Sequence, residues 1–589
     1  MNHALLAVLA VMVVTALGLI SSGRRKQGAA VFAAACFIAL VVFPWQAVDF
    51  LLHAKKGFRH LVAPRLNQFR IGWTALCAGF SALIGTRISE ARPKTQERQD
   101  RWEDPEVFPK LDTILKDTIQ RPPKVSATLL GLANGAGRVT LDDRARESHM
   151  QIVGPTRSGK SQLLFAITAQ DMKRGMPVFF MEAKGDRSDF EQFLKLAGIA
   201  GRAADVRYFN PHDDTASMTF NPIRPVPGQD ATAIANQIAR SIGREPTSSG
   251  EAQDYYRSVD YAKIQTMAEI FYKTHRQFTF KDCFHYFNHA NARIKAFELC
   301  GDKRLVGMAV RSFKDSPDST ALTSAIRPWT TGPLGALLNS YSPQIKLEEV
   351  FEGKQLAYFA VPVGHLQVLA NPLGRMVISG LLSIAASRQK KQPKPPAASI
   401  ILDEFAEFAT PVFASFIATV GSARLWTILS HQDLGQLQRV QGMDVNAFQS
   451  VVFNNTSGAK VCFRAPDPED AEFWSGVLGT HSIFEDTERI SHWFLGDLKT
   501  GEKSRRMVDH FKIHPNRLKN LETGTAMVFS PGRQDCLART ARVYELTKNE
   551  PLPSLSLVET RLDEGLDLEG EVGELEEGQV FDGKGNLVS

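Results

Sequence analysis

Short apolar runs recur between residues 126 and 545, and most of them lie next to a stretch with helical periodicity. Such runs indicate strands that are buried on both faces of a sheet. The expected strands cover residues 151–153, 177–182, 205–209, 356–361, 399–402, 425–429, 459–463 and 526–529. Helical periodicity follows or precedes most of them, for example over residues 374–387 and 407–421. This alternation predicts an α/β fold with a mostly parallel sheet that is covered by helices on both faces.

The alternation is interrupted in the middle of the chain. Between Pro222 and Lys354 there is almost no strand pattern, but there are helical stretches over residues 230–242, 251–274, 280–299 and 303–322. We therefore expect an all-α domain (223–354) inserted into an α/β domain made of residues 126–222 and 355–550.

Three apolar runs precede the α/β pattern, at residues 4–20, 29–52 and 71–84. Each is near the length that crosses about 30 Å of hydrocarbon. The first run lacks the basic flank and cleavage site of a signal peptide, so residues 1–90 are predicted to be a transmembrane anchor of two or three spans. Its orientation stays open, because basic clusters flank every run. The polar residues 91–125 are expected to be a linker.

Charge is unevenly distributed along the chain. The net charge is +6, yet the residues from Val558 onward hold ten acids and only two bases, so the rest of the chain is strongly basic. A basic body suits a polyanionic partner, and residues 551–589 are expected to be an acidic, disordered tail. The six cysteines are scattered without metal-ligand spacing, which argues against a zinc site or a disulfide framework.

The most specific motif follows the expected strand at residues 151–153. It is the P-loop Gly154, Pro155, Thr156, Arg157, Ser158, Gly159, Lys160, Ser161, and Gln162 continues into an apolar helix. Backbone N–H groups and the helix dipole converge on such a loop, so it cradles phosphates. Lys160 is expected to reach the β- and γ-phosphates of ATP, and the Ser161 hydroxyl to bind Mg²⁺.

Two adjacent carboxylates, Asp403 and Glu404, end the expected strand at 399–402. We expect this strand to lie next to the P-loop strand, so that Asp403 supports Mg²⁺ and Glu404 polarises the attacking water.

Polar residues also flank the expected strand at 425–429. Gln432 follows its carboxyl end and is predicted to sense the γ-phosphate. Arg424 precedes it and is a candidate arginine finger for a neighbouring subunit, with a structural salt bridge as an equal alternative. The segment 182–186, Glu-Ala-Lys-Gly-Asp, places charge at the same edge of the sheet, or simply forms a tight turn.

Together these features resemble the conjugative type IV coupling proteins (TraD/TraG type) of the RecA/FtsK-like ATPases. The resemblance rests on the order and spacing of the P-loop, the acid pair, Gln432, the Lys-Gly-Asp turn, Phe220-Asn221-Pro222 before the helical insert, and the membrane anchor. It covers roughly residues 120–545. Family members commonly have Asp-Pro-Lys-Gly-Asp at residues 182–186, and they usually have two membrane spans.

The resemblance implies a RecA-like domain that binds ATP and Mg²⁺ and assembles as a hexamer at the bacterial inner membrane, with the ATPase domain in the cytoplasm. Residues 154–161 would bind nucleotide, Asp403 would support Mg²⁺, Glu404 would be the base, and Gln432 matches the family's glutamine. The implied cargo is single-stranded DNA with its relaxase, bound independently of sequence. The implied partners are relaxosome proteins, through the all-α domain or the acidic tail, and secretion-channel membrane proteins.

Two other functions stay open. One is an FtsK-like chromosomal DNA pump, which the absence of a long Pro/Gln-rich linker disfavours. The other is a nucleotide-switched receptor that docks protein substrates without pumping, which the intact Glu404 disfavours.

Overall fold

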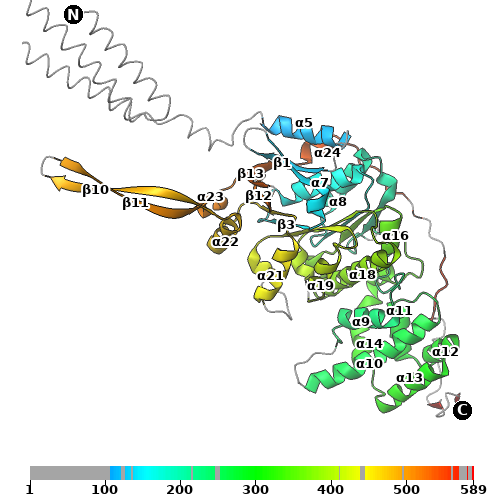
Figure 1. Cartoon of the computed structure of the whole chain (residues 1–589). Coiled ribbons are helices and arrows are strands. Elements are labelled where there is room, and N and C mark those ends of the chain that lie inside the picture. Colours follow the sequence, from blue (N-terminus) through cyan, green and yellow to red (C-terminus); the bar gives the residue numbers. More distant parts are fainter. Residues whose placement is uncertain are drawn as a thin grey trace, which may run out of the picture. The chain divides into compact units, whose positions relative to one another are not determined.

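The computed structural model describes residues 107–588, except for 121–126, 134–136, 214–215, 246–251, 410, 438–444, 494–495, 533, 557, 559–561, 570–579 and 582–586 (Figure 1). The predicted membrane anchor (1–90) lies outside the described residues. Of the predicted linker, the structure describes one amphipathic helix, α5 (Val107–Gln120). The chain from Pro105 to Ser589 forms one compact unit.

An eleven-stranded sheet forms the centre of this unit. It contains all eight expected strands: β3 (Met150–Val153), β4 (Val178–Glu182), β5 (Val206–Phe209), β6 (Leu356–Ala360), β7 (Ala398–Leu402), β8 (Leu425–His431), β9 (Ala459–Cys462) and β12 (Thr525–Ser530). Three further strands were not predicted: β1 (Ala127–Ala133), β2 (Arg138–Asp142) and β13 (Gln534–Thr540). The order is β2-β1-β13-β12-β9-β3-β8-β7-β4-β6-β5. The seven strands from β9 to β5 are parallel and the others pair antiparallel, which confirms the α/β prediction.

The acid-bearing strand is not the neighbour of the P-loop strand, so that expectation was wrong. Strand β8 lies between them, and Ile428 pairs with Met150 of β3 on one side and with Ile401 of β7 on the other. Strand order depends on how the connecting helices pack, and a single sequence does not contain that information. Because all three strands are parallel, their carboxyl ends still meet at one edge of the sheet.

Helices cover both faces of the sheet (Figure 1). One face carries α5, α7 (Lys160–Lys173), α8 (Arg187–Ile199) and α24 (Tyr544–Thr547). The other carries α16 (Leu347–Glu352), α18 (Ala370–Lys391), α19 (Pro411–Thr419) and α21 (Val445–Asn455). Short helices elsewhere are α6 (Asp143–Arg146), α17 (Val363–Leu366), α20 (Leu434–Leu437), α22 (Pro468–Leu478) and α23 (Pro515–Lys519).

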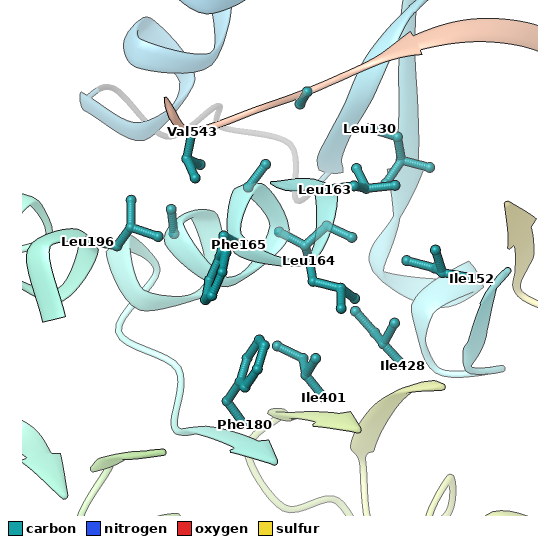
Figure 2. Close-up of a cluster of buried hydrophobic side chains, with 14 of the residues drawn as sticks. Leu130, Ile152, Leu163, Leu164, Phe165, Phe180, Leu196, Ile401, Ile428 and Val543 are labelled. Atoms are coloured by element: carbon teal, nitrogen blue, oxygen red, sulfur yellow. The ribbon is translucent and has the colours of Figure 1, made fainter. Parts of the chain in front are cut away.

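The helix that follows the P-loop is anchored in the main hydrophobic core. Figure 2 shows Leu164 and Phe165 of α7 facing the sheet residues Phe180, Ile401 and Ile428. The Phe165 ring stacks on Phe180 with centroids 5.3 Å apart. Buried aromatic pairs of this kind contribute roughly 0.5–1.5 kcal/mol beyond their buried area. The core therefore fixes the helix whose first turn follows the P-loop.

Within the described part of the chain, one helical stretch, Val363–Lys391, has the length and hydropathy of a membrane span. It consists largely of α18, which has eleven buried residues and packs against neighbouring helices of the sheet's second face. The stretch is accordingly a core helix of the α/β unit.

The segment between β5 and β6 is helical, and within its described residues no named strand occurs. Its main helices are α9 (Ala231–Ser241), α10 (Ala252–Lys273), α11 (Phe280–Asn288), α12 (Ala290–Cys300), α13 (Lys303–Asp315), α14 (Thr320–Ile326) and α15 (Gly332–Leu338). Two of the expected helices are each broken in two. The first break is at the extended His289, and the second is at Ser316, where Pro317 disfavours helical backbone in the residue before it.

A long antiparallel hairpin, β10 (Thr480–Trp493) and β11 (Gly496–Phe511), was also not predicted. Both strands are rich in charged residues and lack a continuous apolar face, so no strand pattern marks them. A second, very short pair is formed by β14 (Val580–Phe581) and β15 (Leu587–Val588).

Part of the tail that was expected to be disordered is packed. Leu566 and Leu568 are both 0% exposed and lie against the helical segment. The expectation was wrong for residues 563–569, because it asked whether the tail could fold alone, whereas these residues use a surface supplied by the rest of the chain.

Candidate nucleotide-binding site

The P-loop connects the carboxyl end of β3 to the first turn of α7. Gly154 and Gly159 have φ values of 156° and 112°, and a Cβ atom on Gly154 would lie 2.6 Å from the Cβ of Phe463. Glycine is therefore required by both the backbone conformation and the available space. The first N–H groups of α7 have no partner within the helix, so the loop presents donors to an anion.

Lys160 is buried at the start of α7. Its Nζ donates to the carbonyl of His431 at 3.1 Å and lies 3.5 Å from Glu404 Oε1. Burial lowers the pKa of Lys160 below its usual value, and the carboxylates of Glu404 and Asp403 oppose this shift. The ammonium group thus faces the acid pair across the carboxyl edge of β8.

Asp403 and Glu404 follow β7 and are both buried. The Ser430 hydroxyl donates to Asp403 Oδ1 at 2.7 Å and fixes that carboxylate. Glu404 has a φ of 53°, a left-handed conformation that is costly for a residue with a Cβ. Its Oε2 atom is buried and has no hydrogen-bond partner among the described residues. A strained, under-bonded carboxylate of this kind is typical of a site that binds or transforms a ligand.

Gln432 follows β8 and reaches the same carboxylate. Its Nε2 donates to Glu404 Oε1 at 3.2 Å, while its backbone N–H donates to Gln436 Oε1 at 2.9 Å. Beside the P-loop, a cavity of about 330 Å³ is lined by Gly154, Pro155 and Gln432, among others. The structure thus brings Lys160, Asp403, Glu404 and Gln432 to one edge of the sheet.

The turn after β4 adds a second cation to this edge. Lys184 Nζ lies 3.8 Å from Asp403 Oδ2 and 3.7 Å from Glu404 Oε1. Burial opposes the charge on Lys184, but the surrounding carboxylates, led by Asp403 and Glu404, outweigh it and raise the pKa of Lys184. The Glu182 carboxylate accepts the N–H groups of Lys184 (2.6 Å) and Gly185 (2.9 Å), which shapes the turn.

Burial also raises the pKa of two carboxylates around this turn, that of Glu182 to about 7 and that of Asp189 to about 6. Both shifts act in the direction that weakens negative charge beside the acid pair.

Several predicted site residues form no side-chain hydrogen bond or ion pair with the acid pair Asp403–Glu404 in the described part of the chain. Thr156 and Arg157 are exposed, whereas the Ser158 hydroxyl is buried without a hydrogen-bond partner among the described residues. The side chain of Gln162 points to another contact, because its Oε1 accepts the N–H groups of Val543 (3.1 Å) and Tyr544 (3.0 Å).

Arg424 lies at the opposite edge of the sheet from Gln432. The seven residues of β8 separate the two, so they are eight residue steps apart, which amounts to roughly 26 Å at about 3.3 Å per step. Its Nε is 3.3 Å from Glu147 Oε1, and Nη1 donates to Pro395 O at 3.2 Å. Within one chain, Arg424 is therefore out of reach of the nucleotide edge.

Sequence reasoning assigned no role to Ser430 and left Lys184 undecided. The available signal was position, because both follow or end strands that were correctly predicted. Their contact with Asp403 depends on β8 and β4 flanking β7 in the sheet, and the sequence did not predict that order.

The sequence profile of the family described as type IV secretory system conjugative DNA transfer matches residues 103–563. Among curated proteins, no sequence matches this chain. Among solved structures, the unbound form of the bacterial conjugative coupling protein TrwBΔN70 is 16% identical, with 75% of this chain and 93% of that chain covered and a TM-score of 0.50.

Two further similar structures have lower scores. TrwB in complex with ADP and Mg²⁺ is 17% identical over 76% of this chain and 92% of that chain, with a TM-score of 0.47. VirB4 of Thermoanaerobacter pseudethanolicus is 14% identical over 72% and 98%, with a TM-score of 0.45.

At this identity, the likeness to unbound TrwB shows a shared fold, and it agrees with the α/β sheet and nucleotide-binding loop described above. The profile match extends over well more than half of the chain and over the whole candidate site. The chain therefore belongs to the conjugative DNA-transfer family of type IV secretion systems, the family whose coupling proteins its motifs resemble.

Proposed function

We propose that this chain hydrolyses ATP and uses the energy to deliver DNA, with its attached relaxase, into a type IV secretion channel. The observation that carries the proposal is the meeting of the P-loop lysine, an acid pair with a strained Glu404 backbone, and an amide at one sheet edge. Lys160 and Gln432 both contact Glu404 Oε1, at 3.5 Å and 3.2 Å. A site that only bound nucleotide would not need the buried, under-bonded Glu404.

The residues present fit ATP and Mg²⁺. The described residues contain no cluster of three His, Cys, Asp or Glu side chains that could hold a metal alone. This agrees with Mg²⁺, which proteins usually bind through one or two side chains together with phosphate oxygens. Ser161 and Asp403 would hold the ion, which would neutralise charge on the phosphates.

The protein's own groups have distinct roles in this proposal. Residues 154–161 hold the phosphates, with Gln162 contributing its backbone N–H in the first turn of α7. Glu404 orients and deprotonates the attacking water, and Gln432 registers the loss of the γ-phosphate because it is bonded to that base. Lys184 holds the acid pair in place until nucleotide binds.

Arg424 is proposed to act on the nucleotide of a neighbouring subunit in a ring, which the resemblance implies is a homo-hexamer. Its support is its location beside a cavity of about 1020 Å³ that is also lined by the basic residues Lys173, Arg174 and Arg388. Such a surface suits an anionic group, although the ion pair with Glu147 must open for Arg424 to reach it.

The remaining proposals concern location and partners. Family membership supports association with a membrane, and we propose anchoring in the bacterial inner membrane through residues 1–90. Relaxosome proteins are proposed to bind the helical segment 223–354, the acidic tail or both, and channel proteins the anchored end. Residues 126–222 and 355–550 are proposed to form the nucleotide-binding domain.

The test of hydrolysis compares Glu404→Gln with Glu407→Gln, a matched change three residues further along the same segment. Glu404→Gln should bind ATP but turn it over roughly 10²–10⁴-fold more slowly, the usual contribution of a general base. Glu407→Gln should retain turnover, and Lys160→Ala should lose nucleotide binding. Full turnover by Glu404→Gln would show that this residue is not the base.

The nature of the cargo is tested by the same assay with additions. A DNA motor should hydrolyse ATP faster when single-stranded DNA is added, and its affinity for DNA should fall as salt rises. Stimulation by a partner protein alone would instead support the nucleotide-switched receptor.

A further inference from the structure

Residues 563–569 of the tail pair with the backbone of the helical segment. The Gln277 N–H donates to the carbonyl of Glu564 at 2.9 Å, and the Leu566 N–H donates to the carbonyl of Gln277 at 2.7 Å. Gln277 and Gly565 thereby form a parallel β-bridge. The loop between α10 and α11 thus binds the tail as an extended peptide, the mode in which sheet edges capture peptides.

Side chains of the helical segment shape a groove around this peptide. Leu566 and Leu568 are completely buried. Asp282 Oδ1 accepts the Leu568 N–H (3.0 Å) and the Tyr341 hydroxyl (2.9 Å). The Tyr341 ring lies so close to Gly565 that a Cβ atom there would be 2.4 Å from it. The groove is therefore selective for small and apolar residues at defined positions of the peptide.

Charge on the two sides is complementary. Lys346 pairs with Asp563 (3.3 Å), Arg276 with Glu564 (2.6 Å) and Lys281 with Glu569 (3.1 Å). Lys295 donates to the carbonyl of Asp567 at 2.7 Å. Four cations from separate elements thus surround one acidic heptapeptide.

We propose that this groove is a peptide-docking site whose built-in ligand is the chain's own residues 563–569. The tail must leave before an acidic segment of another protein, with two leucines spaced as in Leu566-Asp567-Leu568, can occupy it. Buried leucines and a backbone pairing recognise a peptide, whereas a nucleic acid would use the cations alone. The inference does not depend on ATP hydrolysis.

The contacts are suited to exchange. Ordering seven residues costs backbone entropy at each of them, and this opposes the burial of two leucines. The ion pairs involve partly exposed partners, such as Glu564 at 72% and Glu569 at 57% side-chain exposure, so each adds little and is weakened by salt. Covalent attachment supplies the tail at a high effective concentration, which lets modest contacts keep the groove filled.

The experiment measures binding of a fluorescent peptide of residues 560–571 to the full-length chain by anisotropy. Two variants release the tail by different means: Leu566→Asp with Leu568→Asp, and Gly565→Val, which collides with Tyr341. Both should bind the peptide at least tenfold more tightly than the unchanged chain, whose groove is filled. Unchanged ATP binding verifies that the variants are folded.

Charge reversal tests direct contact. In the tail-released chain, Lys281→Glu should weaken binding, and a peptide carrying Glu569→Lys should restore it. Lys273→Glu is the matched control, because Lys273 belongs to the same helical segment but pairs with Asp302 (3.7 Å).

Three results would overturn the proposal. The first is that neither tail variant binds the peptide better than the unchanged chain. The second is that a peptide with both leucines replaced by aspartate binds as well as the original. The third is that a single-stranded oligonucleotide displaces the peptide at similar concentrations, which would make the groove a phosphate site.

Discussion

A buried ion pair joins the P-loop helix to the sheet and gives a quantitative prediction. Arg146 of α6 and Asp171 of α7 are 1% and 0% exposed and form two hydrogen bonds, at 2.5 Å and 2.8 Å. Arg146 also donates to Thr128 (3.2 Å) and to Ser399 of β7 (3.3 Å). The guanidinium therefore ties together α6, α7, β1 and the strand that leads to the acid pair.

Removing Asp171 leaves the Arg146 charge buried without a carboxylate, and removing Arg146 leaves Asp171 with only a longer, 3.9 Å ion pair to Arg174. Breaking a buried ion pair in this way typically costs about 3–5 kcal/mol. Arg146→Met and Asp171→Leu should each destabilise the protein by that amount. The double variant buries no lone charge, and apolar replacements of similar size often restore most of the loss, so we expect a cost of only about 1–3 kcal/mol. The two substitutions should thus be strongly non-additive.

The assay is thermal unfolding of the chain from Pro105 to Ser589, which forms one compact unit. A unit of this length has an unfolding entropy of roughly 1 kcal/mol per kelvin, so the single variants should melt about 3–5 °C lower. The double variant should melt about 1–3 °C lower by the same conversion. Arg144→Met, an exposed arginine of the same helix, is the control and should shift the midpoint by less than about 1 °C.

The reasoning is refuted if the double variant loses as much as the two single variants combined. Additivity would mean that Arg146 and Asp171 stabilise the fold through separate contacts, with no cost from an isolated buried charge.

Two further predictions concern the site and its acid stability. Ser430→Ala removes the 2.7 Å hydrogen bond to Asp403 and should raise the Mg²⁺ concentration needed for ATP turnover by about 10–100-fold, as loss of a ligand-orienting group does. The control Ser422→Ala, at the other end of the sheet, should leave this concentration unchanged. An unchanged Mg²⁺ titration for Ser430→Ala would show that Ser430 does not orient Asp403. Burial lowers the pKa of His149 to about 4, from 6.5 when unfolded, so the unfolded chain takes up a proton first and stability falls as pH decreases from about 6.5 to about 4. Asparagine suits the φ of 59° at this position and can still accept a hydrogen bond from the Thr427 N–H. In thermal melts, His149→Asn should therefore lose less stability than the unchanged protein between pH 7 and pH 4.5. An equal loss of stability in both proteins would rule out His149 as its cause.

The parallel part of the fold could be predicted because its strands are short, apolar and separated by helical periodicity. The sequence pattern did not predict β1, β2 and β13, for a different reason in each case. β1 (Ala127–Ala133) is leucine-rich and has no β-branched residue after Thr128, β2 alternates over only five residues, and β13 is largely polar. These antiparallel strands are specified mainly by their partners rather than by their own pattern.

The candidate site was predictable to the extent that its chemistry lies in contiguous motifs. Gly154 to Ser161 and the pair Asp403–Glu404 can each be recognised within a few residues. The contacts of Ser430 and Lys184 with the acid pair arise only once β8 and β4 flank β7, which is a property of the folded sheet. The docking of Leu566 and Leu568 likewise depends on a partner surface more than two hundred residues away in the sequence.

The helical segment connects β5 to β6, and these two strands pair directly, with Val206 opposite Leu356. The helical segment, well over a hundred residues long, therefore serves as the single connection between the two outermost strands at the β5 end of the sheet. The entropic penalty of such a connection grows only logarithmically with its length. Exchange, shortening or enlargement of this helical segment would accordingly leave the sheet edge that carries Lys160 and Asp403 intact, so relatives could differ widely in this segment while they keep the same P-loop edge.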